Sequence, residues 1–364
     1  MRERLLRAVL APLLCAALII GAFPMAAGEA AYQKFSYIFF GTFDTAITLI
    51  GYARDKATFD RAAARTEALF NRLHAQFDRY KPYQGVNNLY TLNNEAAKGP
   101  VRVPEELFSL LKWCREQQDV AKGYVNIALG SVLRLWHDER DNAEADPLAA
   151  KLPDMDLLRA AAEHTDFNGV VLDEAAGTVY FRDPLLQLDV GAVAKGYAAE
   201  IAAQELLLGE MPNFILNAGG NVRAGLPPAD GRAKWGVAIQ DPDAQTAFFS
   251  GSETLDVLYV ADASVVTSGD YQRFYTVDGK RYHHLIDPFT LMPGGEARSV
   301  TIVTRDSGFA DLLSTAVFLM PYAEGRAFVE SLPGVEALWV LHGGSIEMTD
   351  GIAAVAHSQG ATPQ

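Results

Sequence analysis

The chain has 364 residues, 21% of them charged, and a formal net charge of −14. A chain of this length can bury a sizeable core, as one large domain or as two interlocked ones. The acidic balance argues against a role in binding nucleic acid, because proteins bind phosphate backbones through clustered Lys and Arg side chains.

The first 28 residues differ in composition from the rest of the chain. Arginines at the start precede an apolar run over 8–23, and small residues follow at 26–28. This order is typical of a secretory signal peptide; a retained membrane anchor is the alternative, for which the run is short. We therefore expect an exported protein, in the periplasm or on the outer face of the cytoplasmic membrane, with one mature domain over 29–364.

Hydrophobic patterning predicts the first elements in chain order. The aromatic and β-branched stretch 36–53 predicts strands, and apolar residues at helical spacing predict a helix over 56–77. The polar stretch 87–97 is expected to be a loop, and 104–120 is expected to be a helix. The charged, proline-containing stretch 138–153 is expected to be an exposed excursion.

Further along, 157–164 is expected to be helical, and 169–171 and 178–181 are expected to form paired strands. Helices and strands follow one another without a regular alternation, and no G-x-G-x-x-G motif follows a strand. We therefore expect one α+β unit, with mixed sheets and packed helices, rather than a doubly wound α/β fold.

The segment LDVGAVAKGYAAE over 188–200 is the first that could carry chemistry. It predicts a strand that ends at Asp189, a glycine-containing turn, and a helix with Lys195 at its start. Free backbone N–H groups at a helix start, together with a nearby lysine, suit a phosphate or pyrophosphate. An ordinary strand–turn–helix joint with a solvated lysine explains the same residues.

The segment FILNAGGNVRAG over 214–225 predicts a strand running into Gly219–Gly220. Paired glycines let a ligand or a neighbouring chain approach the backbone closely. A plain hairpin corner explains them equally well, so the pattern decides nothing alone.

A hairpin is predicted over 265–288, because Asp278–Gly279 separates two β-prone runs. Strand alternation sends His283 and His284 to opposite faces, so one of them can face a site. A single histidine here would usually be structural. The acidic, basic and tyrosine side chains close in sequence favour a functional one.

The apolar segment 306–320 predicts a helix with one polar stripe. Asp311, Ser314 and Thr315 have the spacing that places their oxygens on one face. A carboxylate beside two hydroxyls suits a hard cation, which prefers oxygen ligands. The alternative is that the hydroxyls bond to carbonyls one turn earlier, which leaves a buried Asp311 without a partner.

Taken together and in this order, these segments resemble the ApbE-type FAD:protein FMN transferases. The resemblance extends over about 39–340, nearly the whole mature chain. It rests on the motifs FFGTFDTAITL, FDRYKPYQGVNNLYTLN, GYVNIALGSVLRLW, LDVGAVAKGYAAE, LNAGGNVRAG, TSGDYQRFY, HHLIDP and ADLLSTA.

The resemblance implies an α+β fold that binds FAD, Mg²⁺ as the metal, and a role in the chemistry for His284. The residues that it implies in FAD binding are Phe40, Tyr80, Asn126, Ile127, Ala128, Asp189, Lys195 and Ile286. The metal ligands that it implies are the carbonyl of Ala192 and the side chains of Asp311, Ser314 and Thr315.

The implied reaction cleaves FAD, attaches FMN to a Ser or Thr hydroxyl of an acceptor protein, and releases AMP. The acceptor motif of the family, D-G-x-[ST]-G-[AS]-[ST], is absent from this chain, so the acceptor is expected to be another protein. Exported or membrane-bound electron-transfer subunits are the expected acceptors. The alternatives are an FAD pyrophosphatase that yields free FMN and AMP, and a flavin-binding protein without turnover.

The chain departs from the common family pattern in three places. Asn126 and Asn221 stand where the family often has aspartate, and Thr290–Leu291 stand where it commonly has Thr-Gly. The first two departures weaken any role for a carboxylate at those positions, and the third changes the exit from the hairpin.

Overall fold

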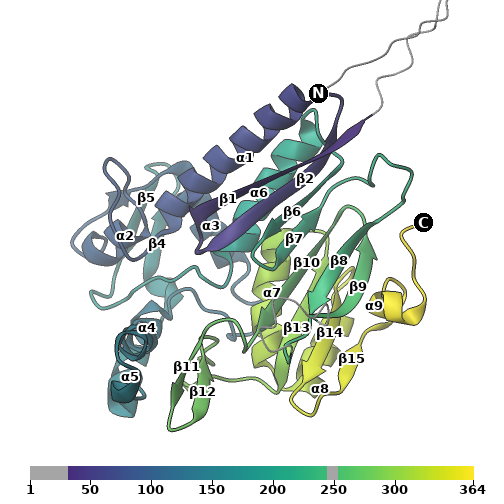
Figure 1. The fold of residues 1–364 in the computed structure, drawn as a ribbon. Coiled ribbons are helices and arrows are strands. Elements are labelled where there is room, and N and C mark those ends of the chain that lie inside the picture. The colour runs from purple at the N-terminus through teal and green to yellow at the C-terminus, as the bar shows by residue number, and fades with distance from the viewer. Residues whose placement is uncertain (1–31, 244–252) are drawn as a thin grey trace, which may run out of the picture. The chain divides into compact units, whose positions relative to one another are not determined.

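The computed structural model describes residues 32–243 and 253–364, and the predicted signal peptide over 1–28 lies outside the described residues. Its main element is an antiparallel eight-stranded sheet in the order β1-β2-β6-β7-β10-β13-β14-β15 (Figure 1). The strands are β1 Gln33–Thr42, β2 Thr45–Ala53, β6 Phe214–Ala218, β7 Asn221–Ala224, β10 Ala263–Gly269, β13 Ala297–Thr304, β14 Glu336–Leu341 and β15 Ile346–Met348.

Three helices pack on one face of this sheet. They are α1 Lys56–Phe77, α6 Ala194–Leu208 and α7 Ser307–Leu319. Helix α1 runs along the β1–β2 hairpin, whereas α7 lies on β10 and β13 and contacts α6 (Figure 1). The apolar side chains between the helices and the sheet form the main core, in which Phe70 and Leu49 are fully buried.

A two-stranded hairpin, β8 Trp235–Gln240 and β9 Thr254–Val260, has its own core with strands of the eight-stranded sheet. Trp235, Leu258 and Leu338 are buried in that core. Both faces of the sheet therefore bury apolar side chains. This explains why β13 and β14 contain runs of consecutive buried residues rather than strict alternation.

The remaining elements surround the main sheet and its helices. A second sheet has the order β3-β5-β4, and a separate hairpin pairs β11 with β12. These elements are α2 Leu89–Glu95, β3 Val101–Arg102, α3 Glu105–Glu116, α4 Gly130–Ala145, α5 Met155–Ala162, β4 Val170–Asp173, β5 Thr178–Phe181, β11 Phe274–Val277, β12 Lys280–His283, α8 Tyr322–Glu330 and α9 Asp350–Ala353.

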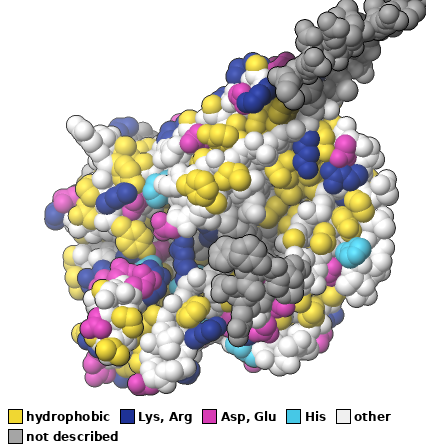
Figure 2. Space-filling model, in the orientation of Figure 1, with side chains coloured by type: hydrophobic (Ala, Val, Ile, Leu, Met, Phe, Trp, Pro, Cys, Tyr) yellow, Lys and Arg dark blue, Asp and Glu magenta, His cyan; other side chains and the backbone are white. Residues whose placement is uncertain are grey.

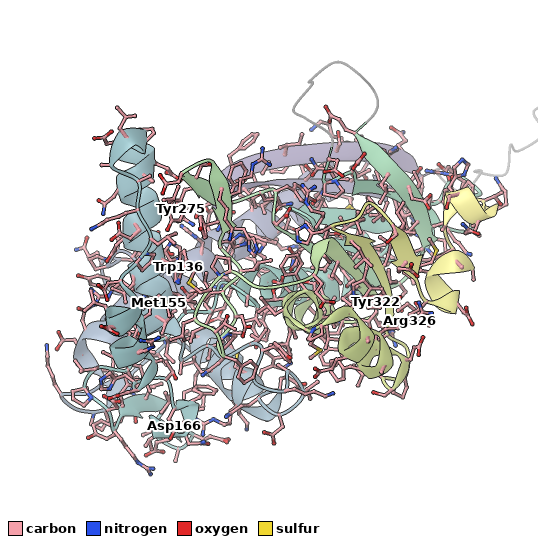
Figure 3. The ribbon with its side chains drawn as sticks, turned by 90° about the horizontal axis from the view of Figure 1, so that it is seen from below. Trp136, Met155, Asp166, Tyr275, Tyr322 and Arg326 are labelled. Atoms are coloured by element: carbon pink, nitrogen blue, oxygen red, sulfur yellow. The ribbon has the colours of Figure 1, made fainter. Side chains whose placement is uncertain are left out.

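A third apolar cluster joins α4 and α5 to the β11–β12 hairpin. Trp136 of α4 lies against Tyr282 of β12, with ring centroids 6.4 Å apart and ring planes inclined by 29°. Figure 3 shows Trp136 and Tyr275 where α4 meets the hairpin. This cluster fixes the position of the hairpin end that carries the two histidines.

Several predicted elements are confirmed. The helix over 56–77 is α1, and the stretch 36–53 forms β1 and β2. The pair Asp278–Gly279 turns between β11 and β12 with positive φ at both residues, 49° and 78°. The pair Gly219–Gly220 also has positive φ at both residues and forms the corner between β6 and β7.

Two predictions of irregular structure are wrong. The stretch 87–97 contains α2, because the Asn88 side chain caps it by accepting from the Thr91 N–H and Leu89 and Leu92 are buried. The expected excursion over 138–153 begins inside α4, where the buried Trp136 and Ala143 hold the helix against its neighbours. Tertiary burial overrides the polar composition of both stretches.

Other boundaries shift by a few residues. The helix expected over 104–120 ends at Glu116, and the one expected over 157–164 is α5, Met155–Ala162. The expected strand before Asp189 is reduced to an isolated bridge between Gln187 and Leu129. Across 32–243 and 253–364, none of the helices has the length and apolar character needed to cross a membrane.

Candidate functional site

The turn that begins at Asp189 is held by a buried ion pair. Arg79 Nη1 lies 2.6 Å from Asp189 Oδ2, and both side chains are at most 10% exposed. The N–H of Gly191 donates to Asp189 Oδ1 over 2.8 Å. Burial alone would raise the pKa of the Asp189 carboxyl, but Arg79, His137 and the Gly191 N–H together hold it below its ordinary value. Asp189 is therefore a carboxylate that fixes the turn before α6.

The predicted flavin-binding loop 126–128 is attached to the same turn. The N–H of Asp189 donates to the Ile127 carbonyl over 2.7 Å. Asn126 Oδ1 accepts from the Ala128 N–H over 2.9 Å, and Asn126 Nδ2 donates to the Thr165 carbonyl over 2.8 Å. An ionised aspartate could not make the second bond, because it has no donor. Asn126, which stands where the family often has aspartate, thus has a structural role in this chain.

A hollow of about 280 Å³ opens beside this loop. Asn126 and Ile127 line it from the loop, Val193 from the turn before α6, and Leu312 from α7. Apolar walls with a few polar groups are typical of sites for planar organic ligands.

Helices α6 and α7 meet at Gly196 and Asp311. The Gly196 N–H donates to Asp311 Oδ2 over 2.8 Å, and Asp311 is only 4% exposed. A Cβ at Gly196 would lie 2.2 Å from the Ser307 carbonyl oxygen and 2.5 Å from Asp311 Cβ, so only glycine fits. Burial raises the pKa of Asp311, opposed by the charge of Lys195, the Asn221 amide and the Gly196 N–H.

The hydroxyls on α7 behave differently from one another. Ser314 Oγ donates to the Asp311 carbonyl over 2.9 Å and lies 2.9 Å from Ser268 Oγ of β10. This is the alternative that the sequence left open, bonding to a carbonyl one turn earlier. Thr315 Oγ1 lies 3.3 Å from Ser268 Oγ and has no shorter partner among the described residues.

The oxygens around Asp311 fit a magnesium ion. Asn221, 2% exposed, lies close enough to lower the pKa of Asp311, yet its Nδ2 makes no hydrogen bond of good geometry within the described residues. A buried carboxylate with a raised pKa is a site that gains from a cation, whereas the Asn221 Nδ2 group is a donor and calls for an acceptor. The parts of the chain that the structure describes contain no cluster of three or more His, Cys, Asp or Glu side chains suited to a metal. Hydroxyl, carbonyl and water oxygens would have to complete the coordination, as Mg²⁺ accepts.

His284 directly follows β12 and is held by its Nδ1, which lies 3.2 Å from the Arg273 carbonyl. Because a carbonyl only accepts, Nδ1 carries the hydrogen and Nε2 is left as an acceptor. Burial, together with the charges of Arg273 and Lys195, lowers the pKa of His284 to about 3. The imidazole is therefore neutral near pH 7, and in this environment it is a weaker base than an ordinary histidine.

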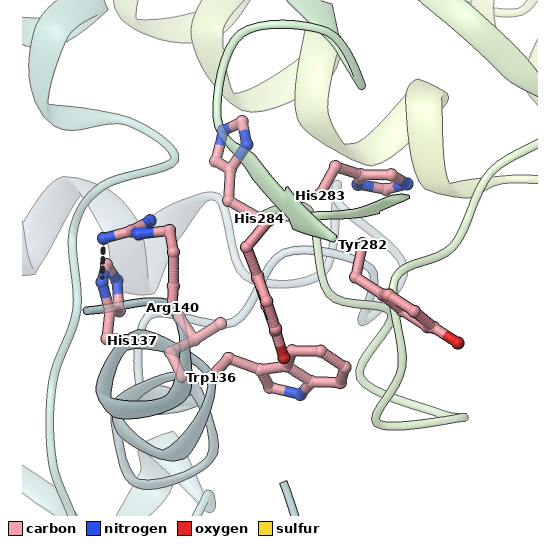
Figure 4. Close-up of a pocket in the computed structure, with 8 residues that line it drawn as sticks. Trp136, His137, Arg140, Tyr282, His283 and His284 are labelled. Carbon is pink, nitrogen blue, oxygen red and sulfur yellow. Dashed lines mark hydrogen bonds between the residues drawn. The ribbon is translucent and has the colours of Figure 1, made fainter. Parts of the chain in front are cut away.

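The neighbouring His283 has a structural environment. Its Nδ1 accepts from the Leu285 N–H over 3.3 Å, and its ring stands edge-to-face on Phe318 of α7 at 5.6 Å. Figure 4 shows the rings of His283 and His284 turned to different sides of the chain. The two side chains thus face apart, as strand alternation predicts.

Two of the predicted flavin contacts are exposed aromatic side chains. Phe40 on β1 is 71% exposed and Tyr80 is 59% exposed. Hydrophobic side chains gather over the β1–β2 hairpin, to which Ile38 and Phe40 contribute (Figure 2). Exposed aromatic rings are suited to stacking on a planar ligand. Ile286, by contrast, is 4% exposed and packs in the cluster around Trp136.

The third departure from the family pattern places a strained residue at the hairpin exit. Leu291 has φ of 62°, a conformation that normally favours glycine. Its side chain is 7% exposed in the cluster with Trp136, whose Nε1 donates to the Leu291 carbonyl over 3.0 Å. Burial of the leucine side chain offsets the strain, which a glycine would avoid.

The structure thus brings the predicted residues into two linked groups. One joins Asp189 to the loop 126–128, and in the other the charge of Lys195 lowers the pKa of His284 and opposes the raised pKa of Asp311. Ala192 lies in the turn between the two groups, next to Val193, the N-cap residue of α6.

Sequence reasoning missed four polar residues around the site. They are Arg79, His137, Arg140 and Ser268. Arg79 stands inside the motif FDRYKP, but nothing local indicates its partner. His137 and Arg140 are three residues apart on α4, a spacing that becomes informative only once this stretch is known to be helical.

The fold and these groups define an α+β protein with a glycine turn and a lysine at the start of a helix, next to a candidate cation site. A family model described as the ApbE family matches residues 43–339. The chain therefore belongs to the ApbE family, and the resemblance seen in its sequence is confirmed.

Relatives and solved structures agree with this assignment. The chain is 34% identical over 302 residues to the FAD:protein FMN transferase of Treponema pallidum (strain Nichols), which covers 79% of this chain and 80% of that protein. It is 30% identical over 279 residues to the FAD:protein FMN transferase of Klebsiella pneumoniae (strain 342), with 75% and 82% covered.

Among solved structures, the ApbE protein of Thermotoga maritima aligns with a TM-score of 0.75 at 29% identity, over 88% of this chain and 98% of that chain. The flavin transferase ApbE of Vibrio cholerae aligns with a TM-score of 0.71 at 20% identity, over 89% of this chain and 100% of that chain. The expected α+β class, with mixed sheets and packed helices, is confirmed.

Proposed function

We propose that this protein is an FAD:protein FMN transferase. It would cleave the pyrophosphate of FAD, join the FMN phosphorus to a Ser or Thr hydroxyl of an acceptor protein, and release AMP. The observation that carries the proposal is the position of Lys195: the adjacent Gly196 N–H donates to Asp311 Oδ2 over 2.8 Å, and the charge of Lys195 acts on both Asp311 and His284. A cation, a neutral imidazole and a buried carboxylate are the groups that phosphoryl transfer requires at one place.

His284 is the group proposed to act on the acceptor. Its Nε2 would take the proton of the attacking hydroxyl, while the oxygen of that hydroxyl forms a new bond to the FMN phosphorus. The bond between this phosphorus and the bridging oxygen breaks, and AMP leaves with that oxygen. The negative charge of the bound pyrophosphate would offset the charges of Arg273 and Lys195 and so raise the pKa of His284 toward the range of an efficient base.

Asp311 and Thr315, with the carbonyl of Ala192, are the oxygen donors proposed to hold Mg²⁺, whereas the Ser314 hydroxyl is engaged with Ser268. When bound, the ion supplies neutralisation of the pyrophosphate charge. Lys195, the second residue of α6, adds its own charge at the helix start. The chain has a net charge of −14, so these cationic groups are needed to draw an anionic substrate.

The flavin half of FAD is proposed to lie between the exposed aromatic side chains and the loop 126–128. Phe40 and Tyr80 offer rings for stacking, and the loop offers backbone groups and an apolar hollow. Asp189 acts in this proposal by fixing the turn, because both of its carboxylate oxygens are already hydrogen-bonded.

The location is part of the proposal. The arginine-rich start and the apolar run over 8–23 support export to the periplasm, with a mature chain starting near Glu29. Intact-mass measurement of the native protein tests this. A chain that retains the first 28 residues and needs detergent for extraction would indicate an anchor instead. The proposed acceptors are exported or membrane-bound electron-transfer proteins carrying a D-G-x-[ST]-G-[AS]-[ST] motif.

The direct test is incubation with FAD, Mg²⁺ and an acceptor domain that carries this motif. In-gel flavin fluorescence on the acceptor and AMP release should rise together. AMP release without labelled acceptor would indicate an FAD pyrophosphatase. FAD binding without either product would indicate a flavin-binding protein.

The roles of the two histidines give a sharper test. His284→Ala should keep FAD affinity and lower single-turnover transfer by about 10²–10⁴-fold, the usual contribution of a general base. His283→Ala is the matched control, and it should transfer at close to the normal rate. Lys195→Ala should lose FAD affinity as well as rate, because its charge acts before and during the reaction. If His283→Ala lost transfer activity and His284→Ala kept it, His283 rather than His284 would be the general base.

A further inference from the structure

A second hollow, also of about 280 Å³, lies between α4 and the end of the β11–β12 hairpin. Trp136, His137 and Arg140 line it from the helix, and Tyr282, His283 and His284 line it from the hairpin and its exit (Figure 4). Its walls are thus mostly aromatic, with one permanent cation.

This hollow adjoins the proposed base but not the proposed phosphate groups. His284 contributes to its lining, whereas Lys195, Asp189 and Asp311 do not. In a phosphoryl transfer the incoming and leaving oxygens lie on opposite sides of the phosphorus. If the nucleotide is bound at Lys195 and Asp311, the incoming hydroxyl therefore approaches from the α4 side of His284.

Arg140 gives the hollow its charge and is held in place there. Its Nη2 donates to His137 Nδ1 over 2.8 Å, and its side chain is 19% exposed. Its nearest carboxylates, on Asp141 and Glu144, lie 3.6 and 3.7 Å away and are about 70% exposed, so they neutralise it only weakly. Burial, together with the charges of Arg140 and Arg79, lowers the pKa of His137.

We propose that this hollow binds the hydroxyl-bearing segment of the acceptor polypeptide, and that Arg140 pairs with an acidic side chain of that segment. The proposal rests on the proposed transferase function. Trp, Tyr and Arg side chains contribute most of the binding energy at many protein recognition sites, and the walls of this hollow contain all three. The remaining NH groups of a half-buried guanidinium are suited to a carboxylate. The acceptor would thereby place its hydroxyl next to His284.

The test compares Arg140→Gln with Arg134→Gln, which removes the same charge from an exposed position on the same helix. The probe is a fluorescein-labelled peptide with a D-G-x-T-G-A-T sequence, together with its Asp→Asn form. Peptide binding to the FAD-loaded enzyme is read by anisotropy, FAD affinity by fluorescence quenching, and FMN transfer by in-gel fluorescence. Thermal unfolding confirms that each variant is folded, and Arg140→Lys is the conservative variant.

Arg140→Gln should weaken peptide binding by about 10- to 100-fold, the range expected for a hydrogen bond to a charged group. FAD affinity should change less than about twofold, and Arg140→Lys should recover part of the loss. The Asp→Asn peptide should bind the wild type as weakly as the parent peptide binds Arg140→Gln, with no further loss when both changes are combined.

Three results would overturn the proposal. Equal peptide affinity in Arg140→Gln and Arg134→Gln would remove the role of Arg140. Loss of FAD affinity in Arg140→Gln would assign the hollow to the nucleotide. If the Asp→Asn change weakened peptide binding to Arg140→Gln as much as it weakens binding to the wild type, Arg140 would not pair with that aspartate. Failure of the transferase function would look different, because the wild type would then bind the peptide without transferring FMN to it.

Discussion

The buried ion pair between Arg79 and Asp189 gives a quantitative prediction. Replacing Arg79 with Met keeps most of the side-chain volume but leaves the Asp189 carboxylate buried without its cation. The change also removes the bonds that Arg79 Nη2 donates to the Gly130 carbonyl and to Gln187 Oε1, at 3.1 and 3.2 Å. Two segments far apart in sequence, one at Gly130 and one over 187–189, thus lose a common partner.

The expected loss of unfolding free energy is about 3–5 kcal/mol, as for one broken partner of a buried pair. That is a large share of the about 5–15 kcal/mol that stabilises a typical domain. The matched control is Arg72→Met, which breaks the pair with Glu106 at 2.9 Å. There the two side chains are 50% and 32% exposed. An exposed pair of this kind contributes about 0–1 kcal/mol.

Urea unfolding of the two variants and of the double variant Arg79→Met/Asp189→Asn measures these costs. The double variant should be more stable than Arg79→Met alone, because it no longer buries an unpaired charge. The folded-state pKa of Asp189 is lowered, so the pair stabilises the protein above the unfolded pKa of about 3.9 and less as pH falls below it. The difference between wild type and Arg79→Met should therefore shrink in acid. Equal costs for Arg79→Met and Arg72→Met would refute the reasoning.

Two further predictions concern the junction of α6 and α7. Gly196→Ala should cost about 1–3 kcal/mol, because the new Cβ would lie 2.2 Å from the Ser307 carbonyl oxygen, whereas Gly99→Ala has open space and should change unfolding by less than about 0.5 kcal/mol. Asp311→Asn should abolish the rise in unfolding temperature that added Mg²⁺ produces, while Asp306→Asn, at the cap of the same helix, should keep it. If Mg²⁺ raised the unfolding temperature equally in both variants, Asp311 would not be a ligand of the metal.

The sequence by itself determined the features that depend on neighbours along the chain. The pair Asp278–Gly279 is sufficient to specify the tight turn, because positive φ at two successive positions suits these residues. The alternation of the following strand then separates His283 from His284. The spacing of Asp311 and Thr315 on one helical face follows from the helical period in the same way. Eight short motifs in a fixed order were also enough to indicate the family.

Only the tertiary structure decided which partner each polar side chain meets. Arg79 and Asp189 are 110 residues apart, and Gly196 and Asp311 are 115 apart. No local pattern encodes such pairs, because they depend on how helices and loops pack on the eight-stranded sheet. The same packing turned part of the expected excursion over 138–153 into α4, since the burial of Trp136 outweighs the polar composition of that stretch. Pairing at long range, rather than local propensity, therefore builds the site.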